Sequence, residues 1–222
     1  MKILVLGGSI FIGYHFVVAA VASGYKVSVF NRGRQSVAYP PGVEQLKGDR
    51  HGDLNALRGR QWDGVVDVSG YLPGAVETTA KLLRDNVGKY CYISSLSVYE
   101  DIDDNTDEAS AVAVISARDL AQAESLPVDD SPTAMTYGNY YGRLKAKCEE
   151  VVRQYFPTEH LILRPGVVAG PRDYSNRLCY WLQKFSRGRT ASRPIHRKHR
   201  YALSTHATWR NGFATMWIIC GA

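Results

Sequence analysis

The 222-residue sequence has few cysteines, no long apolar run and no acidic side chain in its last 36 residues. Its four cysteines include no C-x-x-C pair, so neither a zinc site nor a disulfide framework is expected. The longest apolar stretches have the length of strands, which argues against a membrane span or a signal peptide. The sequence therefore predicts a reduced, cytoplasmic protein without a metal site.

The positive charge of the chain is concentrated at its C-terminus. The formal net charge is +6, but the 186 residues before Arg187 contain 20 basic and 21 acidic side chains. Such a break in composition indicates a boundary. We expect a truncated or aberrant C-terminus in preference to a basic tail that binds RNA or a partner. From about Arg189 onward, the chain is expected to be poorly ordered or loosely attached.

Apolar runs rich in β-formers alternate with amphipathic segments of helix length. Strands are expected at Lys2–Leu6, Lys26–Phe30, Val43–Lys47, Trp62–Val68, Tyr90–Ser94 and His160–Arg164. Helices are expected near Gly13–Ser23, Asp53–Leu57, Gly74–Asn86 and Gly138–Tyr155. This alternation predicts an α/β fold with a doubly wound parallel sheet, the Rossmann fold. Residues 1–174 would form this domain, and 175–222 the start of an incomplete C-terminal substrate lobe and the basic tail.

Residues Glu100–Pro132 interrupt this alternation. They begin with an acidic run and lack a clear period. We expect a solvated insertion, with one short helix at most, in preference to an acidic binding site.

The first strand leads directly into a glycine-rich turn, Gly7-Gly8-Ser9-Ile10-Phe11-Ile12-Gly13, and then into a helix. Glycines at such a junction let the backbone approach a pyrophosphate, whose charge the amides at the helix N-terminus bind. A glycine cluster can also form an ordinary turn, but its place at the first strand–helix junction favours a dinucleotide site. Gly7, Ser9, Phe11, Ile12 and Gly13 are the candidate contacts.

The second strand ends in Asn31-Arg32-Gly33-Arg34. NAD enzymes commonly have an acid here for the ribose 2′-hydroxyl, whereas an arginine suits the 2′-phosphate of NADP. Because no acid is present, Asn31 and Arg32 favour NADP slightly over NAD. The alternative is that the two arginines are only solvated loop residues.

Several segments resemble, in the same order, those of the extended and atypical short-chain dehydrogenase/reductases, the NAD-dependent epimerase/dehydratase family. They are the glycine turn, Gly48-Asp49-Arg50, Ser94-Ser95-Leu96-Ser97-Val98-Tyr99, Tyr141…Lys145 and Leu163-Arg164-Pro165-Gly166-Val167-Val168-Ala169-Gly170-Pro171-Arg172-Asp173. The resemblance covers about residues 1–187. It departs at Ile10, where the family usually has a glycine. Extended members are usually longer, which implies that most of the substrate lobe is missing.

The resemblance implies a catalytic set of Ser95, Tyr141 and Lys145. A second Tyr-x-x-x-Lys pair begins at Tyr180, but the first pair follows the Ser95 strand at the distance that the family shows. Lys145 would favour the Tyr141 phenolate and bind the nicotinamide ribose, and Ser95 would hydrogen-bond the reacting oxygen. The further cofactor contacts implied by the resemblance are Asp49, Arg50, Ser69, Gly70, Pro165 and Val168.

The family implies an NAD(P)-dependent oxidoreductase or epimerase that acts at a secondary alcohol or ketone, with a sugar nucleotide as one candidate substrate. A 4,6-dehydratase is disfavoured, because Leu96-Ser97 stands where that group has Asp-Glu. The alternative is a non-catalytic nucleotide- or RNA-binding protein, similar to the chloroplast stem-loop RNA-binding relatives. The basic tail favours RNA, whereas the intact set of Ser95, Tyr141 and Lys145 favours the enzyme.

Overall fold

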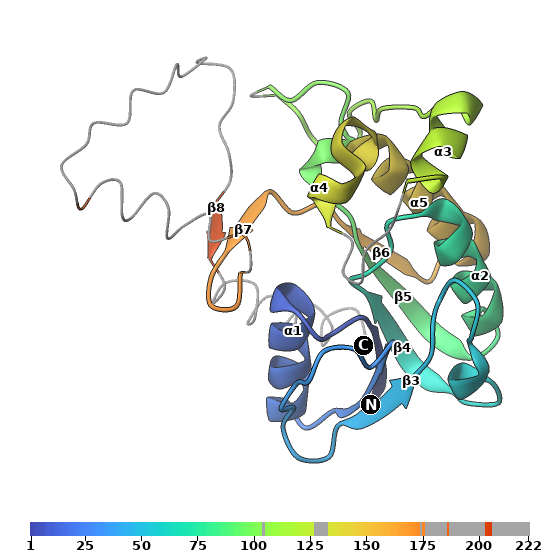
Figure 1. Cartoon of the computed structure of the whole chain (residues 1–222), viewed down its shortest axis with the longest axis vertical. Helices are drawn as coiled ribbons and strands as arrows, with labels where there is room; N and C mark the ends of the chain where they lie inside the picture. The colour runs from blue at the N-terminus through green and yellow to red at the C-terminus, as the bar shows by residue number, and fades with distance from the viewer. Residues whose placement is uncertain (104, 127–132, 174, 176–185, 187–202, 206–222) are drawn as a thin grey trace.

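The computed structural model describes residues 1–103, 105–126, 133–173, 175, 186 and 203–205. Its centre is a six-stranded parallel sheet with the strand order β3-β2-β1-β4-β5-β6 (Figure 1). The strands are β1 (Lys2–Leu6), β2 (Lys26–Asn31), β3 (Glu44–Lys47), β4 (Trp62–Asp67), β5 (Val87–Ile93) and β6 (His160–Leu163). The predicted doubly wound parallel sheet is confirmed.

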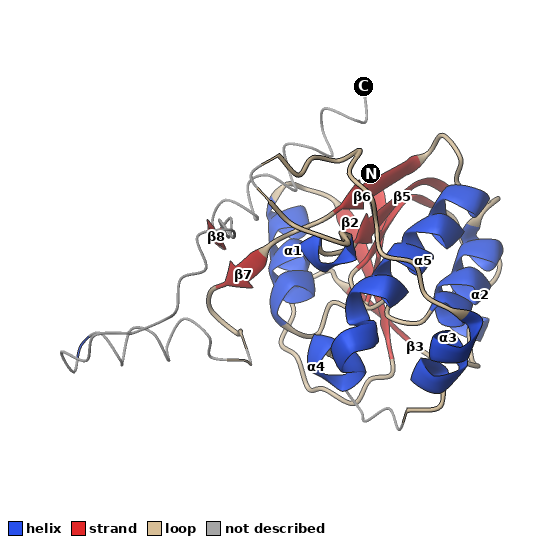
Figure 2. Cartoon of the chain, turned by 90° about the horizontal axis from the view of Figure 1, so that it is seen from above, coloured by secondary structure: helices blue, strands red, loops and turns tan. Residues whose placement is uncertain are grey.

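Helices cover both faces of the sheet. Figure 2 shows α1 (Phe11–Ala22) on one face, and α2 (Pro73–Leu83) and α5 (Tyr141–Tyr155) on the other. Proline at the first position of α2 suits a helix start, because the amide that it lacks would have no partner within the helix. The shorter elements are α3 (Ala117–Glu124), α4 (Ala134–Tyr137) and the 3₁₀ turns η1 (Asn55–Leu57), η2 (Leu96–Val98) and η3 (Gly138–Tyr140).

The apolar run of β1 contributes to two separate cores. Ile3 and Val5 pack in the cluster that contains Phe16 of α1, whereas Leu4 and Leu6 belong to the cluster on the opposite face. Successive side chains of a strand point to opposite faces of its sheet. A strand covered by helices on both faces is therefore apolar throughout, as the sequence of β1 indicates.

The strand order reverses between β1 and β4. From β1 the chain moves outward through β2 and β3, and then returns to β4 and continues through β5 and β6 on the other side. The turns after β1 and β4 therefore diverge at the carboxyl edge of the sheet. In open α/β sheets, ligands bind in the crevice at this place.

Three predicted segments differ from the structure. The helix expected near Asp53–Leu57 is only the 3₁₀ turn η1. Helix α5 begins at Tyr141 and not at Gly138, because the residues before it form the 3₁₀ turn η3. The segment after Tyr99 contains the short helix α3, but Ala123 of this helix is fully buried in a cluster with Leu72 and Leu144. This segment is therefore anchored to the domain and is not a wholly solvated insertion.

Strand β7 (Val167–Ala169) pairs in parallel with β8 (Leu203–Thr205) in a separate two-stranded sheet. Most of the expected substrate lobe and basic tail, and the pair that begins at Tyr180, lie outside the described residues. Across the described part of the chain, no helix has the length and apolar character needed to cross a membrane.

Candidate functional site

A cavity of about 720 Å³ lies at the carboxyl edge of the sheet, where the strand order reverses. The turns after β1, β2, β4 and β5 line it, together with α5 and the segment after β6. Its volume falls in the range of about 300–1,000 Å³ that is usual for small-molecule sites. Every residue predicted for catalysis or cofactor binding lines this cavity, with the exception of Gly70.

The glycine turn has a backbone that few side chains tolerate. Gly7 and Gly8 have φ angles of +103° and +84°. A Cβ atom on Gly13 would lie 2.7 Å from the Cα of Gly8, so only glycine lets α1 start this close to the turn. Phe11 has a φ of 29°, a strained value for a residue other than glycine. Such strain often marks functional sites, and here it lies where the turn passes into α1.

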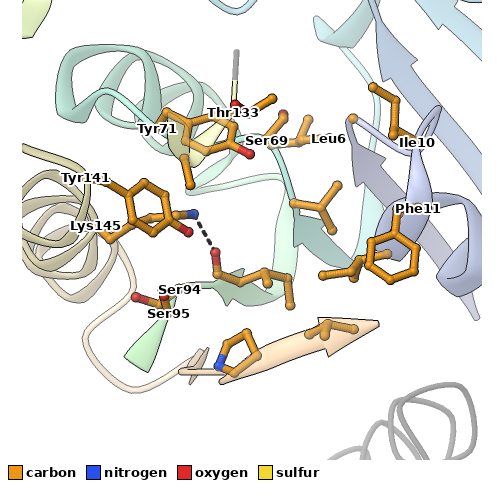
Figure 3. A pocket seen from close by; sticks show the side chains of 18 of the residues that line it. Leu6, Ile10, Phe11, Ser69, Tyr71, Ser94, Ser95, Thr133, Tyr141 and Lys145 are labelled. Carbon is orange, nitrogen blue, oxygen red and sulfur yellow. Dashed lines mark hydrogen bonds between the residues drawn. The ribbon is translucent and has the colours of Figure 1, made fainter. Parts of the chain in front are cut away.

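Ile10 occupies the position where a glycine was expected from the family resemblance. Its backbone is extended, so this residue causes no strain. Its side chain is 37% exposed and lines the cavity. Figure 3 shows Ile10 and Phe11 at the end of the cavity opposite Tyr141 and Lys145. The departure therefore adds an apolar side chain to the cavity wall, while the backbone of Ile10 itself is extended.

Asn31 ties the end of β2 to the glycine turn. Its Nδ2 donates to the Ser9 hydroxyl at 3.0 Å, and its Oδ1 accepts the backbone N–H of Gly33 at 2.8 Å. The adjacent Arg32 and Arg34 both line the cavity. Asn31 therefore shapes the turn, and the two arginines bring positive charge to this end of the cavity.

Asp49 and His51 also line this end of the cavity. The Asp49 carboxylate accepts the backbone N–H of His51 at 3.0 Å, which fixes the turn after β3. Burial lowers the pKa of the His51 imidazole. The negative charge of Asp49 raises this pKa, whereas the positive charges of Arg50 and Arg32 lower it. Burial and the two guanidinium groups therefore favour the neutral form of the imidazole.

Arg50 forms one wall of the cavity and is held by Asp67 at the end of β4. Its two terminal nitrogens each donate to a carboxylate oxygen of Asp67 at 2.8 Å, and Nη1 also donates to Ser69 at 3.2 Å. The Tyr90 hydroxyl donates to the same carboxylate at 2.8 Å. Burial would raise the pKa of Asp67, but Arg50 and these hydrogen bonds outweigh burial and lower it. Arg50 therefore lines the cavity while paired with a residue that the sequence did not single out.

Ser95, Tyr141 and Lys145 meet at the other end of the cavity (Figure 3). Ser95 follows β5 and caps η2, where its hydroxyl accepts the backbone N–H of Ser97 at 3.1 Å. Tyr141 and Lys145 lie one helical turn apart on α5 and so share a face of the helix. The structure thus brings together three residues that are far apart in the sequence.

The Lys145 side chain is fixed on the protein side of the cavity. The residue is only 3% exposed, and its ammonium donates to the carbonyl oxygens of Gly70 at 2.9 Å and Ile93 at 2.7 Å. Burial lowers the pKa of Lys145 to about 8. Gly70 is itself buried behind the cavity, so the described structure gives it the role of a hydrogen-bond acceptor for Lys145.

A buried carboxylate on α5 anchors the Ser95 turn. Glu149 is fully buried and accepts the Ser94 hydroxyl at 2.6 Å. Arg164, at the end of β6, donates to both of its carboxylate oxygens, at 2.9 and 2.7 Å. Burial opposes ionisation of Glu149, but the hydrogen bonds from Arg164 and Ser94 lower its pKa below the ordinary value. The pair connects β5, α5 and β6 directly behind Ser95.

Gly142 lets α5 approach the same turn. A Cβ atom on Gly142 would lie 2.8 Å from the carbonyl carbon of Ser97 and closer still to its oxygen. Any other residue at this position would therefore push α5 away from η2. Gly142 was not predicted as a site residue, because a glycine early in a helix carries no signal of the backbone that it will meet.

The segment after β6 closes the cavity on one side. The Pro165 carbonyl accepts the backbone N–H of Leu96 at 2.9 Å, and Pro165 and Val168 both line the cavity. Further along, the Arg172 guanidinium lies 3.9 Å from the ring centroid of Tyr14 on α1. These contacts hold the segment between the Ser95 turn and the first helix.

Several lining residues were not predicted. Tyr71 and Thr133 line the end that contains Tyr141, as Figure 3 shows, and Glu100 and Asp101 line the cavity as well. The two acids come from the segment expected to be solvated. Their proximity to the cavity depends on tertiary packing, which an acidic run does not reveal.

Within the described residues, no group of His, Cys, Asp and Glu side chains has an arrangement that could hold a metal ion. The charged groups that line the cavity are instead the cations and acids named above.

The model of the NAD dependent epimerase/dehydratase family matches residues 3–200. The chain belongs to this family. The resemblance inferred from the glycine turn, the Ser95 strand end and the Tyr141…Lys145 pair is thereby confirmed. A comparison with curated protein sequences gave no match.

Solved structures of the epimerase/dehydratase group share the fold. A UDP-galactose 4-epimerase has a TM-score of 0.69 and 20% identity, over 98% of this chain and 72% of its own. A mutant of UDP-glucuronic acid 4-epimerase from Bacillus cereus, in complex with UDP-4-deoxy-4-fluoro-glucuronic acid and NAD, has a TM-score of 0.68 and 16% identity, over 98% and 73%. The dTDP-glucose 4,6-dehydratase of Bacillus anthracis str. Ames, in complex with NAD, has a TM-score of 0.66 and 16% identity, over 99% and 71%.

Proposed function

We propose that this chain is an NAD(P)-dependent oxidoreductase or epimerase that acts on a secondary alcohol or ketone. One observation carries the proposal: a single cavity has the glycine turn at one end and Ser95, Tyr141 and Lys145 at the other. Membership of the NAD-dependent epimerase/dehydratase family supports it.

The cavity suits a dinucleotide cofactor. Gly7 and Gly8 have positive φ angles at the first strand–helix junction, and the first turn of α1 contains no acid that would repel a pyrophosphate. The turn and the start of α1 would hold the pyrophosphate, and Lys145 the nicotinamide ribose. When bound, the nicotinamide accepts or returns a hydride.

Tyr141 is the proposed proton acceptor and donor for the substrate hydroxyl. A free tyrosine is a weak base at neutral pH, because its ordinary pKa is about 10. The ammonium of Lys145, one helical turn away and fixed by two carbonyl oxygens, would stabilise the phenolate. The Ser95 hydroxyl would then orient the reacting oxygen toward Tyr141.

A sugar nucleotide is the proposed substrate class. The structural neighbours include a UDP-galactose 4-epimerase and a UDP-glucuronic acid 4-epimerase solved with UDP-glucuronic acid and NAD. These proteins are less than 25% identical to this chain, so they support the class of substrate and not a particular sugar.

NADP is proposed as the preferred form of the cofactor. Arg32 and Arg34 line the end of the cavity where the adenosine ribose would lie, and Asn31 stands where an acid would favour NAD. Several structural neighbours are described in complex with NAD, so the preference rests on the residues of this chain.

Cofactor binding tests this preference without a substrate. Titration calorimetry with NADP and NAD should give tighter binding of NADP, and Arg32→Asp should abolish or reverse the difference. Arg58→Asp makes the same charge change at an exposed residue that does not line the cavity, and should leave the ratio unaltered. An unchanged ratio in Arg32→Asp would contradict a contact of Arg32 with the 2′-phosphate.

Turnover tests the proposed chemistry. The chain is incubated with NAD or NADP and a set of UDP- and dTDP-sugars, and reduced nicotinamide and sugar products are measured. Tyr141→Phe should lower kcat by at least about 100-fold, the usual contribution of a general acid–base group, and retain cofactor binding. Tyr140→Phe is the matched control, because its tyrosine is adjacent but does not line the cavity. Equal activity of the two variants would refute the assignment of Tyr141.

A further inference from the structure

The ammonium of Lys145 lies between two aromatic rings as well as two carbonyl oxygens. Its Nζ atom is 5.0 Å from the ring centroid of Tyr71 and 4.6 Å from that of Tyr92. The hydrogen bonds to Gly70 and Ile93 use two of the three N–H donors of an ammonium. The faces of aromatic rings carry negative charge and attract cations within about 6 Å of the centroid. The two rings therefore complete a cage around the charge of Lys145.

The two rings of this cage have different surroundings. Tyr92 is fully buried, and its hydroxyl donates to the Gly70 carbonyl at 2.8 Å, so it belongs to the core of the sheet. Tyr71 is half-buried in the turn after β4 and lines the cavity beside Tyr141 (Figure 3). Its ring stacks on Tyr137 with centroids 5.7 Å apart and planes at 23°. Tyr71 is thus the cavity-side wall of the cage, and Tyr137 holds it in place.

Tyr71 also contacts the proposed base directly. The rings of Tyr71 and Tyr141 have centroids 6.2 Å apart with planes at 43°, within the distance at which aromatic pairs attract each other. One side chain therefore touches both members of the Tyr141–Lys145 pair. Tyr71 is thus in contact with both partners of the proposed proton-transfer pair.

The charged and titratable groups around Lys145 make the rings important. Four neighbouring groups affect the pKa of Lys145: Asp67 on β4, Glu149 and Cys148 on α5, and Arg50 in the turn after β3. Arg50 binds both oxygens of the Asp67 carboxylate, and Arg164 binds both oxygens of Glu149. Each nearby carboxylate is thus largely neutralised by its own guanidinium, and burial makes the pKa of Cys148 about 11, so its thiol is neutral. The rings and carbonyls therefore add to the stabilisation of the ammonium that Asp67 and Glu149 provide.

We propose that Tyr71 is a positioning residue: its ring keeps the Lys145 ammonium charged and close to Tyr141, and thereby sets the pH at which Tyr141 ionises. The inference rests on the proposed role of Tyr141 as proton acceptor. In this proposal the ring face is the active feature of Tyr71, so phenylalanine, which keeps that face, is expected to substitute for it in setting the ionisation of Tyr141.

The test is a pH titration of tyrosinate absorbance, which needs neither substrate nor cofactor. Subtracting the titration of Tyr141→Phe from that of the parent isolates the ionisation of Tyr141. The subtraction is repeated in the Tyr71→Phe and Tyr71→Leu backgrounds. Tyr71→Leu should raise the midpoint of Tyr141 by about one pH unit, a tenfold change that lies between the values for exposed and fully desolvated cation–π contacts. Tyr71→Phe should leave the midpoint unchanged.

A second series guards against misfolding of the leucine variant. Phenylalanines with increasing fluorine content at position 71 keep the shape of the ring and progressively remove the negative charge of its face. The Tyr141 midpoint should rise in step with fluorination. A constant midpoint in this series, or an equal rise in Tyr71→Phe, would overturn the role of the ring face.

The titration also separates this inference from the proposed function. The wild-type titration should contain one tyrosine that ionises below the ordinary pH range of tyrosine and is lost in Tyr141→Phe. If no such tyrosine is found, the role of Tyr141 is refuted. If that tyrosine is present but insensitive to the ring at position 71, only the role of Tyr71 is refuted.

Discussion

Replacing Gly142 by alanine would place a methyl group 2.8 Å from the carbonyl carbon of Ser97. Carbon atoms that are not bonded to each other normally lie about 3.5–4.0 Å apart, and the Ser97 oxygen would be closer to the methyl group than its carbon is, so α5 and η2 must separate by at least about 1 Å. Overpacking of this kind costs about 1–3 kcal/mol. Alanine is more favourable than glycine in a helix by up to about 1 kcal/mol, which offsets part of the cost. We expect a net loss of about 1–2 kcal/mol, which lowers the Tm by about 2–8 °C.

Gly74→Ala is the matched control for this substitution. Gly74 is likewise the second residue of a helix, α2, but the nearest atom to an added Cβ atom is Glu124 Oε1 at 3.9 Å. This variant should be neutral, or more stable by up to about 1 kcal/mol. Thermal and urea unfolding of the two variants measure the difference in free energy.

The same displacement should affect the site more than the stability. It separates the Ser95 turn from Tyr141, and a misplacement of about 1 Å can lower a rate by about 100-fold. Gly74→Ala should retain full turnover. If Gly142→Ala were as stable and as active as Gly74→Ala, the close packing of α5 against η2 would be refuted.

Three further predictions concern the buried charges. Glu149→Gln should destabilise the protein by about 2–3 kcal/mol in urea unfolding, because Arg164 loses a charged partner; an unchanged midpoint would contradict this. Asp67 and Glu149 have lowered pKa values in the folded state, so their contribution to stability should be complete above about pH 4.5 and decline as the pH falls further. Urea melts from neutral to acid pH measure this; stability that increased on acidification would be contrary to it. The pKa of Lys145 is about 8 in the folded state, against an ordinary value of 10.5. Between these two pH values, Lys145 is protonated in the unfolded chain and deprotonated in the folded one. The free energy of unfolding should therefore rise with pH relative to Lys145→Met, by at most about 3 kcal/mol, and a falling difference would oppose the assignment.

The fold was predictable because its signals are local. The apolar run of β1 and the glycine turn after it are read directly from consecutive residues, and both are found where expected. The residues of the proposed catalytic set were selected for a different reason, since Ser95, Tyr141 and Lys145 resemble motifs of a known family. The structure then placed them at one end of one cavity.

The support of the site was not predictable, because it depends on contacts between distant residues. Arg50 was expected to contact the cofactor, but its partner Asp67 lies on another strand. Glu149 and Arg164 join α5 to β6, and neither position carries a local pattern that indicates the other. Tyr71 follows a buried strand like many loop aromatics, and only tertiary packing brings its ring to Lys145.

Titration calorimetry of the full chain with NADP and NAD tests the central claim most directly. We predict saturable binding of one dinucleotide per chain, competition between the two cofactors for the same site, and a higher affinity for NADP. Bound dinucleotide at about 100 times its Kd should also stabilise the fold by about 2.7 kcal/mol. The absence of heat and of any stabilisation with either dinucleotide at millimolar concentration would contradict the assignment of the cavity as a cofactor site.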